Sequence, residues 1–159
     1  MQEKMILDEL NRRILRELQR DARQTVQQIA AAVGLSTTPC WKRIKDLESA
    51  GVITGYTALV DRSKLGLDLL VVVELNLSQH TEATVQQFER QVAVEPSIVN
   101  CMSTTGPSDY VLIVVARDVA HYEQLLHSCL FKLPGVSQLR SSIVLNQVKA
   151  ETRLPLGVN

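Results

Sequence analysis

Long apolar stretches are missing from this 159-residue sequence. A membrane-spanning helix needs about 18 or more consecutive apolar residues, whereas the run Leu69–Val73 already ends at Glu74. The N-terminus has early acids and no apolar core, so we expect no signal peptide. Cysteine is scarce. The sequence has three, an odd number, at the widely spaced positions Cys40, Cys101 and Cys129, which argues against a disulfide framework. These absences predict a cytoplasmic protein with no membrane partner.

The sequence also lacks an excess of either charge and any clear catalytic pattern. Its 17 Lys+Arg balance 17 Asp+Glu, while a hydrophobic content of 45% is typical of a globular protein. The histidines His80, His121 and His127 have no metal-ligand spacing, and neither a glycine-rich phosphate loop nor a nucleophile–histidine pair is present. We therefore expect no enzymatic activity, no cofactor and no metal site.

The first 54 residues have helical periodicity. Apolar positions within Leu7–Ala22 fall on one face, and Thr25 with Gln28 forms a capping-box pattern that opens a second helix. Gly34-Leu35-Ser36 is a short turn before a third helix, with Ser36 as its N-cap. Two helices joined by such a turn predict a helix-turn-helix, although an ordinary three-helix bundle has the same periodicity.

The third helix favours DNA contact over the ordinary bundle. Its buried stripe is Cys40, Ile44 and Leu47, and no acid appears in it before Asp46. The residues expected at DNA are Ser36, Thr37, Thr38, Trp41, Lys42, Arg43 and Lys45. Among these, Thr37, Thr38, Trp41 and Lys42 are candidates for base edges, and Arg43 and Lys45 for phosphates. Trp41 fits equally a base or sugar contact and packing against the neighbouring helix.

Residues 69–148 read as a duplicated strand–helix–strand unit. The expected elements are Leu69–Leu77, Thr81–Val94, Ile98–Thr105, Tyr110–Ala116, Asp118–Lys132 and Val136–Val148. Their order predicts a βαββαβ ferredoxin-like fold, and Val52–Val60 is expected to add a wing or linker strand. Several strands are apolar on both faces, so a homodimer that packs the sheets together is expected. The predicted domains are 1–54, a hinge and linker at 55–68, and 69–159.

Several short motifs occur in an order that resembles one known family. They are Ser36–Arg43 (S-x-x-P-C-x-x-R), Gly51–Ile53, Gly55–Ala58, Gly106–Tyr110 and Leu133–Val136. Together they resemble the Lrp/AsnC, or feast/famine, family of bacterial transcription factors, over about Leu7 to Leu156. Asn11 stands where that family often has an acid, a departure that bears on an ion pair of the first helix.

The resemblance implies an α+β architecture and a regulatory function. The expected parts are an N-terminal winged helix-turn-helix domain and a C-terminal ferredoxin-like (RAM-type) domain. It implies a sequence-specific regulator that binds double-stranded DNA, responds to a small amino acid and forms a homodimer, with a tetramer or an octamer as the larger assemblies left open. A ligand-independent architectural DNA-binding protein is the alternative, and an amino-acid-metabolising enzyme is a remote one.

The turn Gly106-Pro107-Ser108-Asp109-Tyr110 is the expected effector site. Backbone N–H groups near Gly106 suit a carboxylate and Asp109 suits an ammonium, although the same residues also make a good hairpin turn. In the family this site lies between subunits, which implies completion by the last strand at Ser141, Ser142 and Ile143. The apolar residues expected to flank it, which favour a small or aliphatic effector, are Met102, Val111, Leu112 and Val114.

Overall fold

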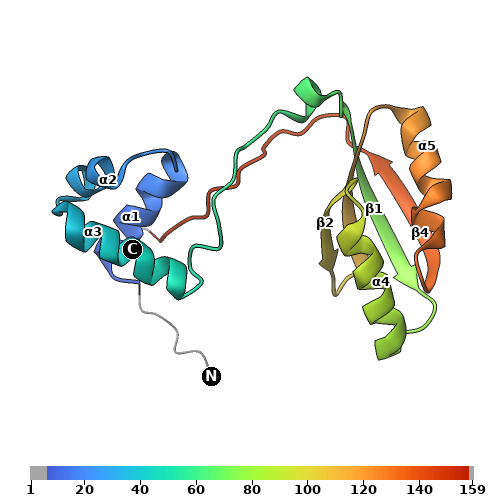
Figure 1. Ribbon diagram of the computed structural model, residues 1–159. Helices are drawn as coiled ribbons and strands as arrows, with labels where there is room; N and C mark the ends of the chain where they lie inside the picture. The colour runs from blue at the N-terminus through green and yellow to red at the C-terminus, as the bar shows by residue number, and fades with distance from the viewer. Residues whose placement is uncertain (1–6, 158–159) are drawn as a thin grey trace. The chain divides into compact units, whose positions relative to one another are not determined.

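The computed structural model describes residues 7–157, which form two compact units (Figure 1). One unit, called the helical unit below, contains residues 7–59 together with 149–157. The other, the sheet unit, contains residues 60–148. Within the described residues, no helix is long and apolar enough to cross a bilayer.

Three helices build the helical unit, and each begins near the residue expected from the sequence. Asp8 caps the first helix by accepting a hydrogen bond from the Asn11 N–H at 2.7 Å. Thr25 and Gln28 form both hydrogen bonds of a capping box on the second helix, and Gly34 ends it with a φ of 76°. The helices are α1 (Glu9–Arg20), α2 (Val26–Val33) and α3 (Thr37–Ser49).

The core of the helical unit confirms the predicted stripe of α3. Cys40, Ile44 and Leu47 are buried, and they belong to one cluster with buried residues of α1 and α2. Leu156, near the C-terminus, is partly buried against the same cluster. A segment from the far end of the sequence thus packs against the core of the helix-turn-helix.

The observed division differs from the expected one of 1–54, 55–68 and 69–159. Residues 149–157 lie with the helices because the side chain of Gln19 pairs with the backbone of Leu154 and Leu156 packs against the helical core. The helical unit on the N-terminal side extends to Leu59.

The sheet unit has the predicted ferredoxin-like topology. Its four strands lie in the order β2-β3-β1-β4 and every neighbouring pair is antiparallel. A 3-10 turn precedes the sheet and another follows α5. The elements are η1 (Arg62–Leu65), β1 (Leu69–Leu77), α4 (Glu82–Val94), β2 (Ile98–Ser103), β3 (Tyr110–Ala116), α5 (Val119–Ser128), η2 (Leu130–Lys132) and β4 (Val136–Ile143).

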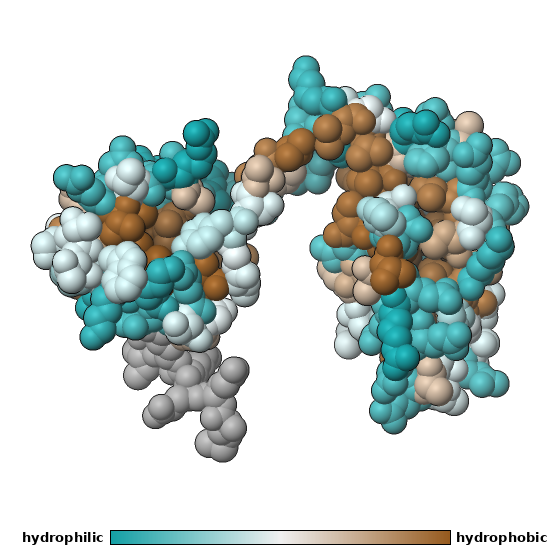
Figure 2. All heavy atoms as spheres, in the orientation of Figure 1, coloured by the Kyte–Doolittle hydropathy of each residue, from teal (hydrophilic) through white to brown (hydrophobic). Residues whose placement is uncertain are grey.

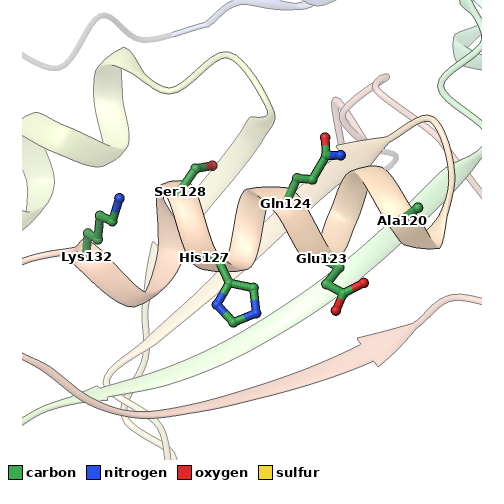
Figure 3. A pocket seen from close by; sticks show the side chains of 6 residues that line it. All are labelled: Ala120, Glu123, Gln124, His127, Ser128 and Lys132. Atoms are coloured by element: carbon green, nitrogen blue, oxygen red, sulfur yellow. The ribbon is translucent and has the colours of Figure 1, made fainter.

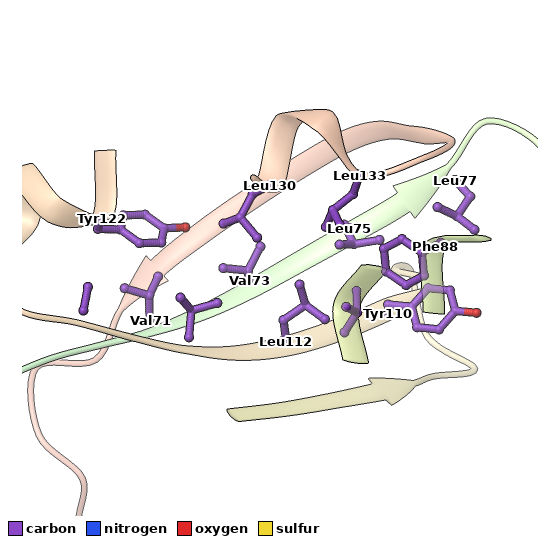
Figure 4. Packing of buried hydrophobic residues seen from close by; sticks show 13 residues of the cluster. Val71, Val73, Leu75, Leu77, Phe88, Tyr110, Leu112, Tyr122, Leu130 and Leu133 are labelled. Atoms are coloured by element: carbon purple, nitrogen blue, oxygen red, sulfur yellow. The ribbon is translucent and has the colours of Figure 1, made fainter. Parts of the chain in front are cut away.

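One face of the sheet packs against α4 and α5 (Figure 4). Val71, Val73 and Leu75 of β1 point into this core, where Phe88 of α4 and Tyr122 of α5 meet them. The core consists of Val71, Val73, Leu75, Leu77, Phe88, Val92, Tyr110, Leu112, Val114, Ala116, Tyr122, Leu130 and Leu133.

The opposite face of the sheet is apolar in part. Because side chains alternate along a strand, Val72 and Ile113, which pair across β1 and β3, point to this face and are only partly buried. Met102 of β2 is exposed. Toward β4 the face is polar, with Glu74 and Arg140 3.5 Å apart.

Two strand predictions are wrong. Val52–Val60 contains no strand in the structure, and the described part of the chain gives it no strand to pair with. The last strand ends at Ile143 rather than Val148. After the Val144 N–H donates to the Leu70 carbonyl, β1 offers no further partners, because it begins at Leu69. The connecting segments therefore expose apolar side chains (Figure 2), among them Leu59, Val60, Leu145 and Val148.

Candidate functional site

The outer face of α3 exposes most of the residues expected to contact DNA. Thr37, Thr38 and Lys42 are exposed, and the Trp41 side chain is 51% exposed. Ser36 occupies the N-cap position, but its side chain makes no capping hydrogen bond. The Ser36 hydroxyl and the first N–H groups of α3 are therefore not used by a side-chain cap, and such groups suit a phosphate.

The three cations of α3 differ in what they contact. Within residues 7–157, Lys42 forms no ion pair, whereas Lys45 lies 2.6 Å from Glu48. Glu48 also accepts a hydrogen bond from the hydroxyl of Tyr56 at 3.0 Å. The Lys45 hydrogen bond is the main reason that the pKa of Glu48 lies below its usual value. Lys42 is thus the cation of α3 that is most available to a phosphate or a base.

Arg43 joins α3 to α1. Its Nη1 donates to Asp8 Oδ2 at 2.6 Å and to Asn11 Oδ1 at 2.9 Å. Asn11 is only 3% exposed, so this interaction satisfies an acceptor that water does not reach. The pKa of Asp8 is lowered, first by the Asn11 backbone N–H and then by Arg43. A first-helix ion pair therefore exists, made by Asp8 and assisted by the Asn11 amide.

A small hollow lies beside this contact. Pro39, Lys42 and Asp46 of α3 line it together with Asn11 and Arg43. The remaining N–H groups of Arg43 make no hydrogen bond within the described residues. One guanidinium can therefore hold α1 through Nη1 and still present donors to a phosphate.

The turn at residues 106–110 is tied to the end of β1. The Leu77 N–H donates to Asp109 Oδ2 at 2.8 Å, and the Asp109 N–H donates to Asn76 Oδ1 at 2.8 Å. His80 Nε2 lies 2.9 Å from the same Asp109 oxygen. The Leu77 N–H, followed by His80, lowers the pKa of Asp109 below its usual value.

The remaining turn residues differ in their surroundings. Ser108 is buried, its carbonyl accepts from the Thr104 hydroxyl, and the Tyr110 hydroxyl donates to Glu89 at 3.2 Å. Pro107 is exposed. Gly106 has no positive φ, and a Cβ built there would meet no atom within 4 Å. Neither the backbone nor packing within the described chain requires glycine at position 106.

A single chain does not bring the turn together with Ser141, Ser142 and Ile143. Ile143 pairs with Val71, whereas the turn bonds to Leu77. Val71 and Leu77 are six residues apart on β1, and at about 3.3 Å per residue this places them about 20 Å apart. Ser141 is engaged with the Tyr122 hydroxyl at 2.7 Å.

Two of the four apolar residues expected to flank the turn do not face an open site. Leu112 and Val114 point into the helix-covered core, with exposures of 0% and 1%, and cannot line an open site. Met102 and Val111 face the opposite side of the sheet, where they pair across β2 and β3. Alternation along β3 separates the two sets of side chains.

Another hollow lies on the outer face of α5 (Figure 3) and contains none of the expected effector residues. Glu123 and His127 lie one helical turn apart beside it, and Lys132 borders its end. Its lining is Ala120, Glu123, Gln124, His127, Ser128 and Lys132.

Sequence reasoning missed the groups that hold these sites in place. Asp8 received no role toward α3, although it binds Arg43 as well as capping α1. His80 and Asn76 received no role, although both contact Asp109. An acid at the start of one helix and an arginine in another carry no local signal of their pairing, because the contact depends on how the helices cross.

Protein-family models match both units. A model described as the Lrp/AsnC ligand binding domain matches residues 70–154, and one described as a winged helix-turn-helix DNA-binding domain matches residues 7–54. The leucine-responsive regulatory protein of Escherichia coli strain K12 is 39% identical over 148 residues, which are 93% of this chain and 90% of that protein. The family models describe ligand-binding and DNA-binding domains, and the matching relatives are named as regulatory proteins rather than enzymes, as expected.

Solved structures agree over almost the whole length. A transcriptional regulator from Neisseria meningitidis in complex with L-methionine is 30% identical with a TM-score of 0.89, covering 95% of this chain and 97% of that one. An AsnC family regulator from Agrobacterium tumefaciens is 36% identical with a TM-score of 0.89, covering 94% and 97%.

Proposed function

Because this chain belongs to the Lrp/AsnC family of transcriptional regulators, we propose that it binds double-stranded DNA through α3 as a cytoplasmic homo-oligomer and that a small amino acid adjusts this binding. The exposed face of α3 is the observation that carries the proposal. It combines a free Ser36 hydroxyl, two exposed threonines and Lys42 without an acid partner in the described chain. A helix placed in the major groove reads bases with such residues near its N-terminus.

The effector site is proposed at the turn 106–110. Two observations support it: the Leu77 N–H and His80 hold the Asp109 carboxylate in place, and neither backbone conformation nor packing within the described chain requires glycine at position 106. Leu77 and His80 both contact Oδ2, so Oδ1 makes no contact within the described residues and suits an ammonium. The Neisseria relative was solved with L-methionine. A small or aliphatic, uncharged amino acid is the proposed ligand class.

The dimer is proposed on the sheet face that α4 and α5 leave uncovered. Val72 and Ile113 lie there beside exposed Met102. Covering this face with a second copy removes apolar surface from water. A second copy also supplies the proposed contribution of Ser141, Ser142 and Ile143 to a turn that they do not reach within one chain.

A thermal-shift screen of the full-length protein against the twenty amino acids tests the effector. A ligand that binds only the folded state raises the melting temperature. Gel-shift titrations with and without the best ligand then test the link to DNA. If no amino acid changes either the melting temperature or DNA affinity, the protein is a ligand-independent architectural DNA-binding protein.

Asp109→Asn tests the site itself. Asparagine still accepts a hydrogen bond from the Leu77 N–H, but the negative charge is lost. Removal of one charge-assisted contact of about 1.5–3 kcal/mol lowers effector affinity about ten- to hundredfold in isothermal titration. His80→Ala is the control: it removes the imidazole that competes for Asp109 and leaves the charge. Equal affinities of wild type and Asp109→Asn would place the ammonium elsewhere.

A further inference from the structure

The C-terminal segment forms a specific contact with α1. The amide of Gln19 donates to the Leu154 carbonyl at 3.1 Å and accepts from the Leu154 N–H at 2.6 Å. One turn earlier, Arg16 donates to the Gly157 carbonyl at 3.3 Å. Leu156 is partly buried against the helical core. Two-sided pairing of an amide side chain with one residue's backbone fixes both the direction and the register of the segment.

The segment also contains an ion pair of its own. Arg153 bonds to both carboxylate oxygens of Glu151 at 2.8 and 2.9 Å. This contact lowers the pKa of Glu151 to about 2. Both side chains are partly exposed, and within the described residues their hydrogen bonds are to each other rather than to α1.

The two chain connections to the helical unit are anchored on different helices. The C-terminal segment is anchored on α1 through Gln19 and Arg16. The linker after α3 is anchored on α3 itself, where the Tyr56 hydroxyl donates to Glu48. Arg43 of α3 links these two helices through its hydrogen bonds to Asp8, the N-cap of α1, and to Asn11 within α1.

We propose that α1 is a docking surface for the chain's own C-terminal segment, and that this docked segment transmits the effector signal to α3. The second part rests on the proposed function. The segment follows β4, which carries Ser141, Ser142 and Ile143, so residues 144–153 connect the proposed effector strand covalently to the residues that dock non-covalently on α1. An effector bound at β4 alters how the segment docks on α1, and the Arg43 contacts with Asp8 and Asn11 carry that change to α3.

Leu156→Ala and Leu154→Ala form a matched pair in the full-length protein. Both remove the same atoms, two residues apart, but Leu156 packs on the core whereas the Leu154 side chain is 72% exposed. Hydrogen exchange of α1 amides is expected to become about fivefold faster or more in Leu156→Ala and to stay unchanged in Leu154→Ala. Gln19→Ala, which keeps the core, is expected to act like Leu156→Ala. Equal exchange in all variants would overturn the docking surface.

The coupling is measured separately, as the ratio of DNA affinities with and without the bound amino acid. In Leu156→Ala and Gln19→Ala this ratio is expected to move toward one, while amino-acid affinity in isothermal titration stays at the wild-type value. An unchanged ratio in both variants would overturn the transmission. If the wild type binds no amino acid, the proposed function and the transmission both fail, whereas the exchange result still decides the docking surface.

Discussion

Arg43 shows how one side chain serves two contacts at the residue scale. Its Nη1 donates to the buried side-chain oxygen of Asn11 and to the Asp8 carboxylate, and its other donors remain for the proposed contact with DNA. Loss of Arg43 therefore affects folding as well as binding. Lys42, the next residue toward the N-terminus, has no ion pair within residues 7–157 and offers a comparison without the folding effect.

Arg43→Ala is expected to lower the free energy of unfolding by about 1–3 kcal/mol, because a buried acceptor loses its partner. Lys42→Ala is expected to leave stability within about 0.5 kcal/mol and to reduce the salt slope of DNA binding by about 0.9 if Lys42 meets one phosphate. Urea unfolding and gel-shift titrations at several salt concentrations separate the two variants. Wild-type stability in Arg43→Ala would show that the interhelical contact contributes nothing.

At the scale of elements, the loop before β4 packs closely against α4. Gly135 has a φ of 75°, and its carbonyl accepts from the Ser78 N–H at 2.8 Å. A Cβ built at this position would lie 2.4 Å from Thr84 Cγ2 of α4. Here conformation and space both require glycine.

Gly135→Ala is expected to destabilise the sheet unit by more than about 1 kcal/mol, since strain at positive φ adds to the clash with α4. Gly66→Ala is the matched control, because Gly66 has a φ of 71° but no atom within 4 Å of its Cβ position. The difference between the two melting temperatures isolates the contact with Thr84. Equal melting temperatures would mean that α4 shifts without cost.

The elements that were predicted correctly have strong local signals. Cys40, Ile44 and Leu47 recur at helical spacing, and the bounds of Leu69–Leu77 and Tyr110–Ala116 agree with the structure. The end of β4 could not be predicted, because Val144–Val148 has strand composition and lacks only a neighbour to pair with. The docking of Leu156 on the helices likewise depends on contacts between distant parts of the chain.

At the scale of the whole molecule, the proposed dimer depends on the uncovered sheet face. Val72→Glu is expected to yield folded monomers of 17.7 kDa, because the carboxylate would be buried without a partner only in the dimer. Val94→Glu, at a position 77% exposed on α4, is the control and keeps the wild-type mass. Sedimentation at low micromolar concentration measures both. A wild-type protein that sediments as a monomer would contradict the dimer.

The contribution of both chain ends to the helical unit has a consequence for synthesis on the ribosome. Residues 7–59 are translated first, but Leu156 and the Gln19 contact arrive only after the entire sheet unit has been made. At a translation rate of about 5–20 residues per second, several seconds pass between the synthesis of the helices and that of the segment that packs on them. The nascent helix-turn-helix therefore lacks these contacts while the sheet unit is being made, and it gains them only when residues 154–157 have been added.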